Sequence, residues 1–299
     1  MALRRADRTN FVKTRAVRPL ALARRGPRLG LVPGWQRYTD PPSIERHVVP
    51  LPAHLGGLDG ARIVQVSDLH VGRYMRAEHW AAHIERINAL APDLVVITGD
   101  AMDWARRYEG DYLEPLDGLE PRVAALAILG NHDFYFGADR LARGYQRSRS
   151  VRVLRAERWE SDALPGLSIW GIDDPMSSLT ASARYPRLRT WADGGLDPRR
   201  YNVLLSHRPD AFRYAPELGF DLQLSGHTHG GQIVVAPWGK KLHIASVLGP
   251  WDQGAFEARH ARLYVSRGLG FAGVPYRRDC PTEITVHELR VAAGARAAA

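Results

Sequence analysis

The chain has 299 residues, of which 45% are hydrophobic and 24% charged, the composition of a globular protein with a sizeable core. Its single cysteine excludes an intrachain disulfide and a multi-cysteine metal site. The formal charge of +9 is uneven: residues 1–40 contain ten arginines or lysines against two aspartates, a net +8, which leaves +1 for residues 41–299. A folded domain with a broad nucleic-acid groove is therefore not expected.

This charge distribution predicts two parts, a flexible basic arm (1–40) and one folded domain (41–299). Such an arm favours contact with an anionic bilayer; a disordered tail or a misassigned start codon is the alternative. No apolar run approaches the ~18 residues of a membrane span, and Arg4-Arg5 is not followed by the apolar stretch of a secretory signal. We therefore expect a cytoplasmic protein, held peripherally at the inner membrane by its arm.

The first elements of the domain are a short strand near Arg46–Val49 and a strand at Ala61–Ser67 that is rich in β-branched residues. Asp68 and His70 follow the second strand directly. In an extended chain, residues two apart face the same side, so both side chains could reach one metal ion. A helix is expected over 77–90, because apolar residues recur there at the spacing of one helical face and Pro92 then stops the helix.

Two buried strands of the parallel type are predicted next, at Leu94–Thr98 and Val123–Leu129. Each ends in a polar motif that a glycine opens, Gly99-Asp100 and Gly130-Asn131-His132-Asp133. Glycine permits the tight turn and the close backbone approach that such a position requires.

The second half of the chain is richer in strand. Val203–Ser206 leads into His207, and Leu222–Ser225 leads into Gly226-His227-Thr228-His229. Further strands are expected at Leu167–Gly171, Ile233–Val235, Leu263–Ser266 and Ile284–His287. This order predicts an α/β fold, a sandwich of two mixed β-sheets flanked by helices in four layers.

Five segments that carry histidine or carboxylate thus follow predicted strands, at the edge where open α/β sheets place their ligands. They supply the nitrogen and oxygen ligands that two adjacent divalent metals need, and such a pair hydrolyses phosphoesters. A Gly-His-x-His match alone arises by chance roughly 0.05 times in a chain of this composition, so the interpretation depends on the five segments together.

The order of these motifs resembles that of the calcineurin-like metallophosphoesterases, from about Ile63 to Ile233. Their flanks resemble a bacterial branch of membrane- or wall-associated phosphodiesterases that includes UDP-2,3-diacylglucosamine pyrophosphatase. The flanking segments are Ser67–His70, His207–Asp210, Leu224–Ile233 and Arg267–Gly270. Members of that branch usually carry an N-terminal membrane or export segment, whereas this chain has the basic arm.

The resemblance implies two divalent metal ions, Mn, Fe or Zn, with Asp100 bridging them. One ion would be held by Asp68, His70, Asp100 and His229, and the other by Asp100, Asn131, His207 and His227. It also implies that His132 contacts the scissile phosphate and donates a proton to the leaving oxygen, oriented by Asp133. Asp103 stands where the purple acid phosphatases have a tyrosine, so a tyrosinate–iron centre is not expected.

The favoured function is metal-dependent hydrolysis of a phosphodiester or pyrophosphate bond, with a lipid-linked or UDP-sugar substrate of the lipid A type. A nuclease or nucleotide phosphodiesterase is the alternative, which the near-neutral body disfavours. A non-catalytic scaffold is less favoured still, because no expected ligand is missing. Arg73, Arg208 and Arg277 could bind a diphosphate, although solvated or ion-paired side chains are the alternative. Six aromatic residues could line an apolar cleft or belong to the core: Trp104, Tyr135, Phe136, Trp238, Trp251 and Phe271.

Overall fold

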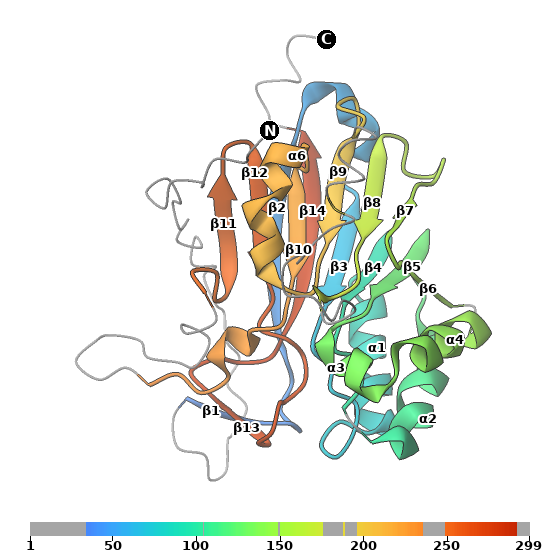
Figure 1. The fold of residues 1–299 in the computed structure, drawn as a ribbon, viewed down its shortest axis with the longest axis vertical. Helices are drawn as coiled ribbons and strands as arrows, with labels where there is room; N and C mark the ends of the chain where they lie inside the picture. Colours follow the sequence, from blue (N-terminus) through green and yellow to red (C-terminus); the bar gives the residue numbers. More distant parts are fainter. Residues whose placement is uncertain are drawn as a thin grey trace.

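The computed structural model describes residues 34–103, 105–148, 150–175, 188, 196–235 and 249–291. In this part of the chain two six-stranded mixed sheets form a sandwich, and a two-stranded sheet lies at one end of it (Figure 1). Helices pack on the outer faces, which confirms the predicted α/β sandwich in four layers.

The first sheet has the strand order β2-β14-β3-β4-β5-β6. Its strands are β2 (Ser43–Leu51), β14 (Glu283–Val291), β3 (Arg62–Val66), β4 (Leu94–Thr98), β5 (Ala124–Ile128) and β6 (Val151–Val153). From β3 to β6 the strands run parallel, as the apolar runs predicted, while β14 from the end of the chain inserts antiparallel to β3.

The second sheet has the order β11-β12-β10-β9-β8-β7, and the small sheet pairs β1 with β13. The strands are β11 (Gly254–Ala258), β12 (Ala261–Val265), β10 (Leu222–Ser225), β9 (Tyr201–Leu205), β8 (Leu167–Gly171), β7 (Glu157–Trp159), β1 (Trp35–Arg37) and β13 (Tyr276–Arg278). Strands β8, β9, β10 and β12 are parallel, so their carboxyl ends meet at one edge.

The helices are mostly short. The α-helices are α1 (Ala77–Asn88), α2 (Glu109–Leu113), α3 (Asn131–Phe136), α4 (Ala138–Ser148) and α6 (Ala215–Leu218). The 3₁₀ turns are η2 (Ala53–Leu58), η3 (Arg106–Tyr108), η4 (Glu114–Gly118), η6 (Pro209–Arg213) and η7 (His229–Gly231). Helix α1 buries Trp80, Ile84 and Ile87, the apolar face that the sequence predicted.

Along the central strands, successive side chains point to opposite faces of the sheet, so each strand contributes to a core on both faces. On β4, Leu94 and Val96 face the second sheet, while Val95 and Ile97 pack under α1 beside Trp80. Both faces of β4 are therefore covered, which is why its sequence is apolar throughout instead of alternating.

One predicted strand is wrong, and several short ones were not predicted. Ile233–Val235 forms an isolated bridge between Ile233 and Arg278 instead of a strand. The unpredicted strands are β1, β6, β7, β11 and β13, and all but β11 have three residues. Three residues are too few to show alternation, so these strands depend on their partners.

The folded part begins earlier than the charge pattern indicated. Residues 1–33 lie outside the described residues, but β1 pairs antiparallel with β13. The buried Gln36 donates to Thr282 Oγ1 at 3.0 Å and accepts from Thr282 N at 2.7 Å. Arg37 and Asp40 cancel in charge, so the whole +8 of residues 1–40 lies in residues 1–33.

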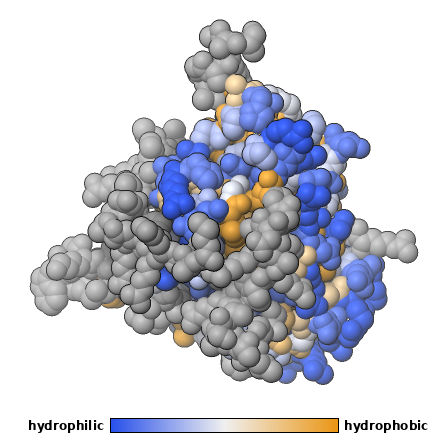
Figure 2. All heavy atoms as spheres, turned by 45° about the horizontal axis from the view of Figure 1, so that its top comes forward, coloured by the Kyte–Doolittle hydropathy of each residue, from blue (hydrophilic) through white to orange (hydrophobic). Residues whose placement is uncertain are grey.

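The described surface on the face seen in Figure 2 is mainly hydrophilic, with few apolar side chains among the charged ones. Across the described residues, no helix combines the length and the apolar character that crossing a membrane requires.

Gln65 of β3 joins the two sheets through a fully buried amide. Its Nε2 donates to Thr98 Oγ1 at 3.1 Å and to Ser225 O at 3.0 Å, and its Oε1 accepts from His287 Nε2 at 2.9 Å. We predict that Gln65→Leu lowers the free energy of unfolding, by about 1–3 kcal/mol for each buried group left unpaired. Chemical denaturation measures this loss. The exposed Gln146→Leu is the control, and equal stability of the two variants would contradict the bridging role.

Candidate metal centre

The candidate ligands lie on loops at the carboxyl ends of β3, β4, β5, β9 and β10. Backbone hydrogen bonds join these loops directly. Asp68 N donates to Gly99 O at 2.9 Å, and His70 N donates to Asp100 O at 3.1 Å. The same edge of both sheets therefore holds all five motifs together, as their position after each strand predicted.

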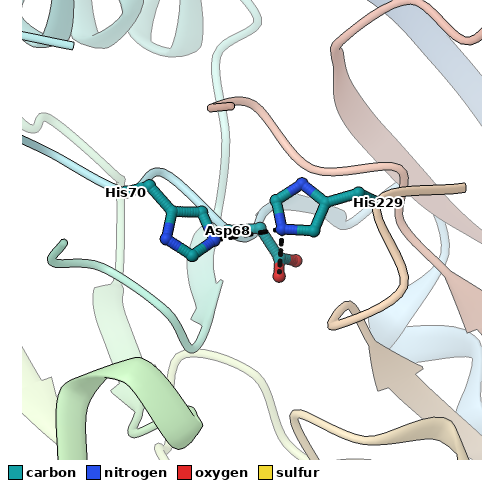
Figure 3. A group of neighbouring side chains, drawn as sticks. All are labelled: Asp68, His70 and His229. Atoms are coloured by element: carbon teal, nitrogen blue, oxygen red, sulfur yellow. Dashed lines mark hydrogen bonds and ion pairs between the residues drawn. The ribbon is translucent and has the colours of Figure 1, made fainter. Parts of the chain in front are cut away.

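The first cluster consists of Asp68, His70 and His229, whose ligand atoms lie within 4.8 Å of one another (Figure 3). His229 Nε2 is 3.4 Å from Asp68 Oδ1 and 3.0 Å from His70 Nε2. All three side chains are buried. Two imidazole nitrogens and a carboxylate oxygen thus converge on one point.

The second cluster consists of Asp100, His207 and His227, again within 4.8 Å. His207 Nδ1 donates to Thr98 O at 2.8 Å, which directs Nε2 toward Asp100 Oδ2 at 3.2 Å. His70 Nε2 lies 3.8 Å from the same oxygen. Asp100 therefore stands between the two clusters, the position that the resemblance implied for a bridging ligand.

Asn131 begins α3 beside Asp100. The next residue, His132, donates its backbone N–H to Asp100 Oδ1 at 2.8 Å. Asn131 Oδ1 and His227 Nδ1 are buried, and within the described part of the chain neither has a hydrogen-bond partner. A buried polar atom without a partner has to be explained, and an ion can satisfy it.

The backbone around the clusters is strained at the ligands themselves. Five of the ten non-glycine residues with positive φ in the described chain are candidate ligands. They are Asp68 (51°), His70 (46°), Asp100 (51°), His227 (73°) and His229 (51°). The sequence argument brought Asp68 and His70 together correctly, but its reason, that both lie on one side of an extended strand, is wrong. β3 ends at Val66, and left-handed turns aim both side chains inward.

Two glycines allow the loops to approach one another. A β-carbon on Gly226 would lie 2.1 Å from Asp68 Oδ2, and one on Gly130 would lie 2.2 Å from Asp100 Oδ1. Any side chain at either position would displace a candidate ligand. The close backbone approach predicted for Gly130 agrees with this geometry, and Gly226 meets the same constraint.

Opposing effects act on the buried charges. Burial, together with repulsion from Asp100, raises the pKa of Asp68 to about 6. Burial also acts to raise the pKa of Asp100, but His207, together with the neighbouring His70 and His132, outweighs it and holds that pKa below its usual range. Burial lowers the pKa of His70 to about 4, so its imidazole is neutral at pH 7, the form that binds metals.

This donor set fits divalent metal ions. It offers imidazole nitrogens, carboxylate oxygens and one amide oxygen, which suit first-row transition metals. The repulsion between Asp68 and Asp100 is the kind that a cation held between them would offset. The residues that could hold ions are Asp68, His70, Asp100, Asn131, His207, His227 and His229.

His132 and Asp133, the two predicted catalytic residues, follow Asn131 directly. The possible ligand atoms of His132, His70 and Asp100 lie within 4.8 Å of one another. The His132 ring meets the His70 ring edge-on, with 4.6 Å between the ring centroids. The carboxylate of Asp133 accepts from Gly130 N at 2.8 Å and from Met102 N at 3.1 Å. Asp133 is thus held by backbone amides and anchors the loop that carries His132, and its role in orienting the imidazole stays a prediction.

The three arginines have different environments. Arg277 is fully buried and donates to Gly270 O at 2.7 Å and to His229 O at 3.2 Å, so it is neither solvated nor available to a diphosphate. Arg208 donates to Asp174 Oδ2 at 2.7 Å and lies 3.1 Å from His227 Nε2. Arg73 is exposed over the Tyr74 ring.

Of the six aromatic residues, Trp104 and Trp238 lie outside the described residues. Phe136, Trp251 and Phe271 are buried in the core, whereas Tyr135 is 59% exposed and meets the His132 ring edge-on. Among the four aromatic residues that the structure describes, Tyr135 is the one placed to border the site.

Sequence reasoning missed Asp174, a buried carboxylate that fixes Arg208 beside His227. A signal for it was present, because Asp174 follows β8 as the other site residues follow their strands. It also missed the contact between Arg277 Nη2 and His229 Nδ1, which are 3.2 Å apart. These residues are separated by 48 positions in the sequence, so no local pattern predicts the contact.

Several proteins named as metallophosphoesterases are similar in sequence to this chain. The chain is 31% identical over 271 residues to the uncharacterized metallophosphoesterase YkuE of Bacillus subtilis, which covers 86% of this chain and 89% of that protein. It is 28% identical over 268 residues to a Danio rerio transmembrane protein with metallophosphoesterase domain, covering 84% of this chain and 58% of that protein. A solved dimetal phosphatase from Danio rerio has a TM-score of 0.44 and 12% identity, over 71% of this chain and 88% of that one.

Residues 61–231 match the family described as calcineurin-like phosphoesterase. This segment runs from the start of β3 to the turn that holds His229, and so it contains every candidate ligand. The match confirms the resemblance of the motifs: the chain belongs to the calcineurin-like phosphoesterases, a family of metal-dependent phosphoric ester hydrolases.

Proposed function

We propose that this enzyme hydrolyses a phosphodiester or pyrophosphate bond at two divalent metal ions that share Asp100. The observation that carries the proposal is the place of Asp100 in two ligand groups, with His70 on one side and with His207 and His227 on the other. A carboxylate can serve both ions because it has two oxygens. Mn, Fe and Zn all suit these nitrogen and oxygen donors.

The chain's own residues would divide the chemistry as follows. Bound metals supply an activated water and offset the charge of the phosphoryl oxygens. The half-buried His132 stands next to His70 and Asp100, with its backbone fixed by the Asp100 carboxylate. From there its imidazole can contact the phosphoryl group and donate a proton to the leaving oxygen.

Arg208 supports a substrate with a second phosphoryl group. Its side chain is 27% exposed, its Nε is held by Asp174, and it lies beside His227. A guanidinium fixed in this way suits bidentate recognition of phosphate. A lipid-linked or UDP-sugar diphosphate is therefore the favoured substrate class, as the resemblance to the branch with UDP-2,3-diacylglucosamine pyrophosphatase suggests.

A nuclease or nucleotide phosphodiesterase is the alternative within the family. It is less favoured because residues 41–299 carry only +1, whereas a nucleic-acid groove needs clustered basic residues. Comparing hydrolysis of a nucleotide-sugar diphosphate, a lipid-linked diphosphate and single-stranded DNA would distinguish these classes.

The first prediction for this function concerns metal content. Protein reconstituted with Mn, Fe or Zn should bind two ions per chain, and Asp100→Ala should weaken both, because the variant removes the shared carboxylate. Elemental analysis after gel filtration measures this content, with the exposed Asp162→Ala as the control. One tightly held ion remaining in Asp100→Ala would show that Asp100 serves a single metal.

The second prediction separates His132 from the ligands. His132→Ala should keep its metal but lose roughly 10²–10⁴-fold in rate, the usual contribution of an acid–base group. The loss should be largest for substrates with poor leaving groups, which most need a proton. His229→Ala is the matched comparison, since it should lose metal; equal metal loss in both variants would make His132 a ligand.

A further inference from the structure

One loop at the ligand edge carries no candidate ligand. Residues Arg267–Gly270, which we call the β12 loop, follow β12, whose carboxyl end lies at the same edge as those of β9 and β10. The loops after β9 and β10 supply metal-ligating histidines, whereas the β12 loop consists of an arginine, two glycines and a leucine. What this loop does at the edge therefore depends on its contacts.

The β12 loop is hydrogen-bonded to the backbone that carries Asp68 and His70. Leu269 N donates to Ser67 O at 2.8 Å, and Gly270 N donates to Asp68 O at 2.8 Å. These bonds hold a strained stretch of chain, because φ is positive at Asp68 (51°) and at His70 (46°). Backbone in that region persists where its surroundings fix it, and the β12 loop is part of those surroundings.

The two glycines bring the β12 loop close against this backbone. A β-carbon on Gly270 would lie 1.9 Å from Leu69 O, and one on Gly268 would lie 2.8 Å from the β-carbon of Asp68. The atom met at Leu69 belongs to the backbone, which cannot turn aside as a flexible side chain can. A side chain at position 270 would therefore displace the chain between Asp68 and His70.

The third residue of the first cluster, His229, is linked to the same loop. Gly270 O accepts from Arg277 Nη2 at 2.7 Å, and Arg277 Nη1 donates to His229 O at 3.2 Å. All three side chains of Figure 3 are thus connected to Gly270, Asp68 and His70 through their own loop and His229 through Arg277.

The first residue of the β12 loop, Arg267, lies between two carboxylates. Its Nη2 is 2.6 Å from Glu45 Oε1 of β2 and 2.6 Å from Glu283 Oε2 of β14. Glu283 is 1% exposed and also accepts from Arg267 N at 3.2 Å and from Tyr264 Oη at 3.0 Å. Burial acts to lower the pKa of Arg267, but both glutamates, together with Tyr264, outweigh it and hold that pKa above its usual range. The loop is thereby tied to two strands of the first sheet.

We propose that the β12 loop is a positioning clamp for the first cluster. It holds Asp68, His70 and His229 where one metal ion can bind, and the ion pairs of Arg267 hold the loop itself. Groups behind the ligands set metal affinity in many proteins, because they fix the orientation of each ligand. The inference rests on the proposed pair of ions that share Asp100.

The second ion depends on this loop less. Its candidate ligands Asp100, His207 and His227 lie on the loops that follow β4, β9 and β10. A link does reach them, because His227 N donates to the Asp68 carboxylate at 3.0 Å. A disturbed β12 loop should therefore weaken the ion of the first cluster strongly and the other ion slightly.

Titration of the metal-free full chain with Mn²⁺ tests the clamp without a hydrolysis assay. Gly270→Ala should weaken one of the two ions about 10- to 100-fold, the usual effect of disturbing a group behind a metal ligand, and change the other far less. Isothermal titration calorimetry measures both affinities. With Mn²⁺ matched to the two sites, electron paramagnetic resonance should show coupled ion pairs in the wild type and isolated ions in the variant.

A second variant and two controls accompany Gly270→Ala. Glu45→Gln loosens the anchor but leaves the pair between Arg267 and Glu283, so it should weaken the same ion by less. Gly56→Ala is the matched control, because a β-carbon there would meet nothing within 4 Å. Phe220→Leu changes the core just before the amino end of β10; it lowers stability and should keep both ions. Thermal unfolding compares the stability of the four variants.

Unchanged affinity for both ions in folded Gly270→Ala would overturn the clamp. Equal weakening of both ions in Gly270→Ala and in Phe220→Leu would also overturn it, because the contacts would then contribute to stability alone. If Gly270→Ala does not fold, Glu45→Gln decides, and unchanged affinities there would refute the proposal. A wild type that binds a single ion would contradict the proposed function instead. The clamp would then be judged by whether Gly270→Ala weakens that ion more than Phe220→Leu does.

Discussion

The site is organised around the buried carboxylate of Asp100, which is 2% exposed. A carboxylate without water needs compensating partners, since its isolated charge is costly in a protein interior. The partners come from two different loops: the backbone N–H of His132 and the imidazole of His207. These loops follow β5 of the first sheet and β9 of the second, so both sheets must be correctly packed before Asp100 is satisfied. The sandwich is thus a precondition for the chemistry, and the site in turn ties the two sheets together.

Holding so many ligands at one edge strains the backbone. Five candidate ligands have positive φ, and each such residue costs on the order of 1–3 kcal/mol. The buried carboxylates of Asp68 and Asp100 also repel one another, which helps to raise the pKa of Asp68. Metal ions that bind only the folded chain would offset these costs and stabilise it by mass action. A cation site therefore explains three features together: the strained backbone of the ligands, the two neighbouring negative charges, and unpaired ligand atoms such as Asn131 Oδ1.

Arg277 links the metal centre to the periphery of the fold. Its guanidinium is fully buried, yet its hydrogen bonds go to the carbonyls of Gly270 and His229. Through it, strand β13 is fixed against the turn of His229, and β13 in turn pairs with β1. The last ligand in the chain and the strand pair β1–β13 are consequently linked by one network of contacts.

Sequence by itself determined the α/β class, the central strands and the candidate ligands that lie together in the metal-binding groups. Buried parallel strands such as β4 are uniformly apolar, and their ends carry glycine-led polar motifs, so both signals are local. Tertiary structure decided what local patterns do not encode. The three-residue strands β1 and β13 exist because they pair with one another, and β14 enters the first sheet between β2 and β3. Asp133 anchors a loop through backbone amides, and Arg277 contacts a ligand 48 residues away. Such contacts depend on which loops meet in space, and only the packing of the two sheets settles that.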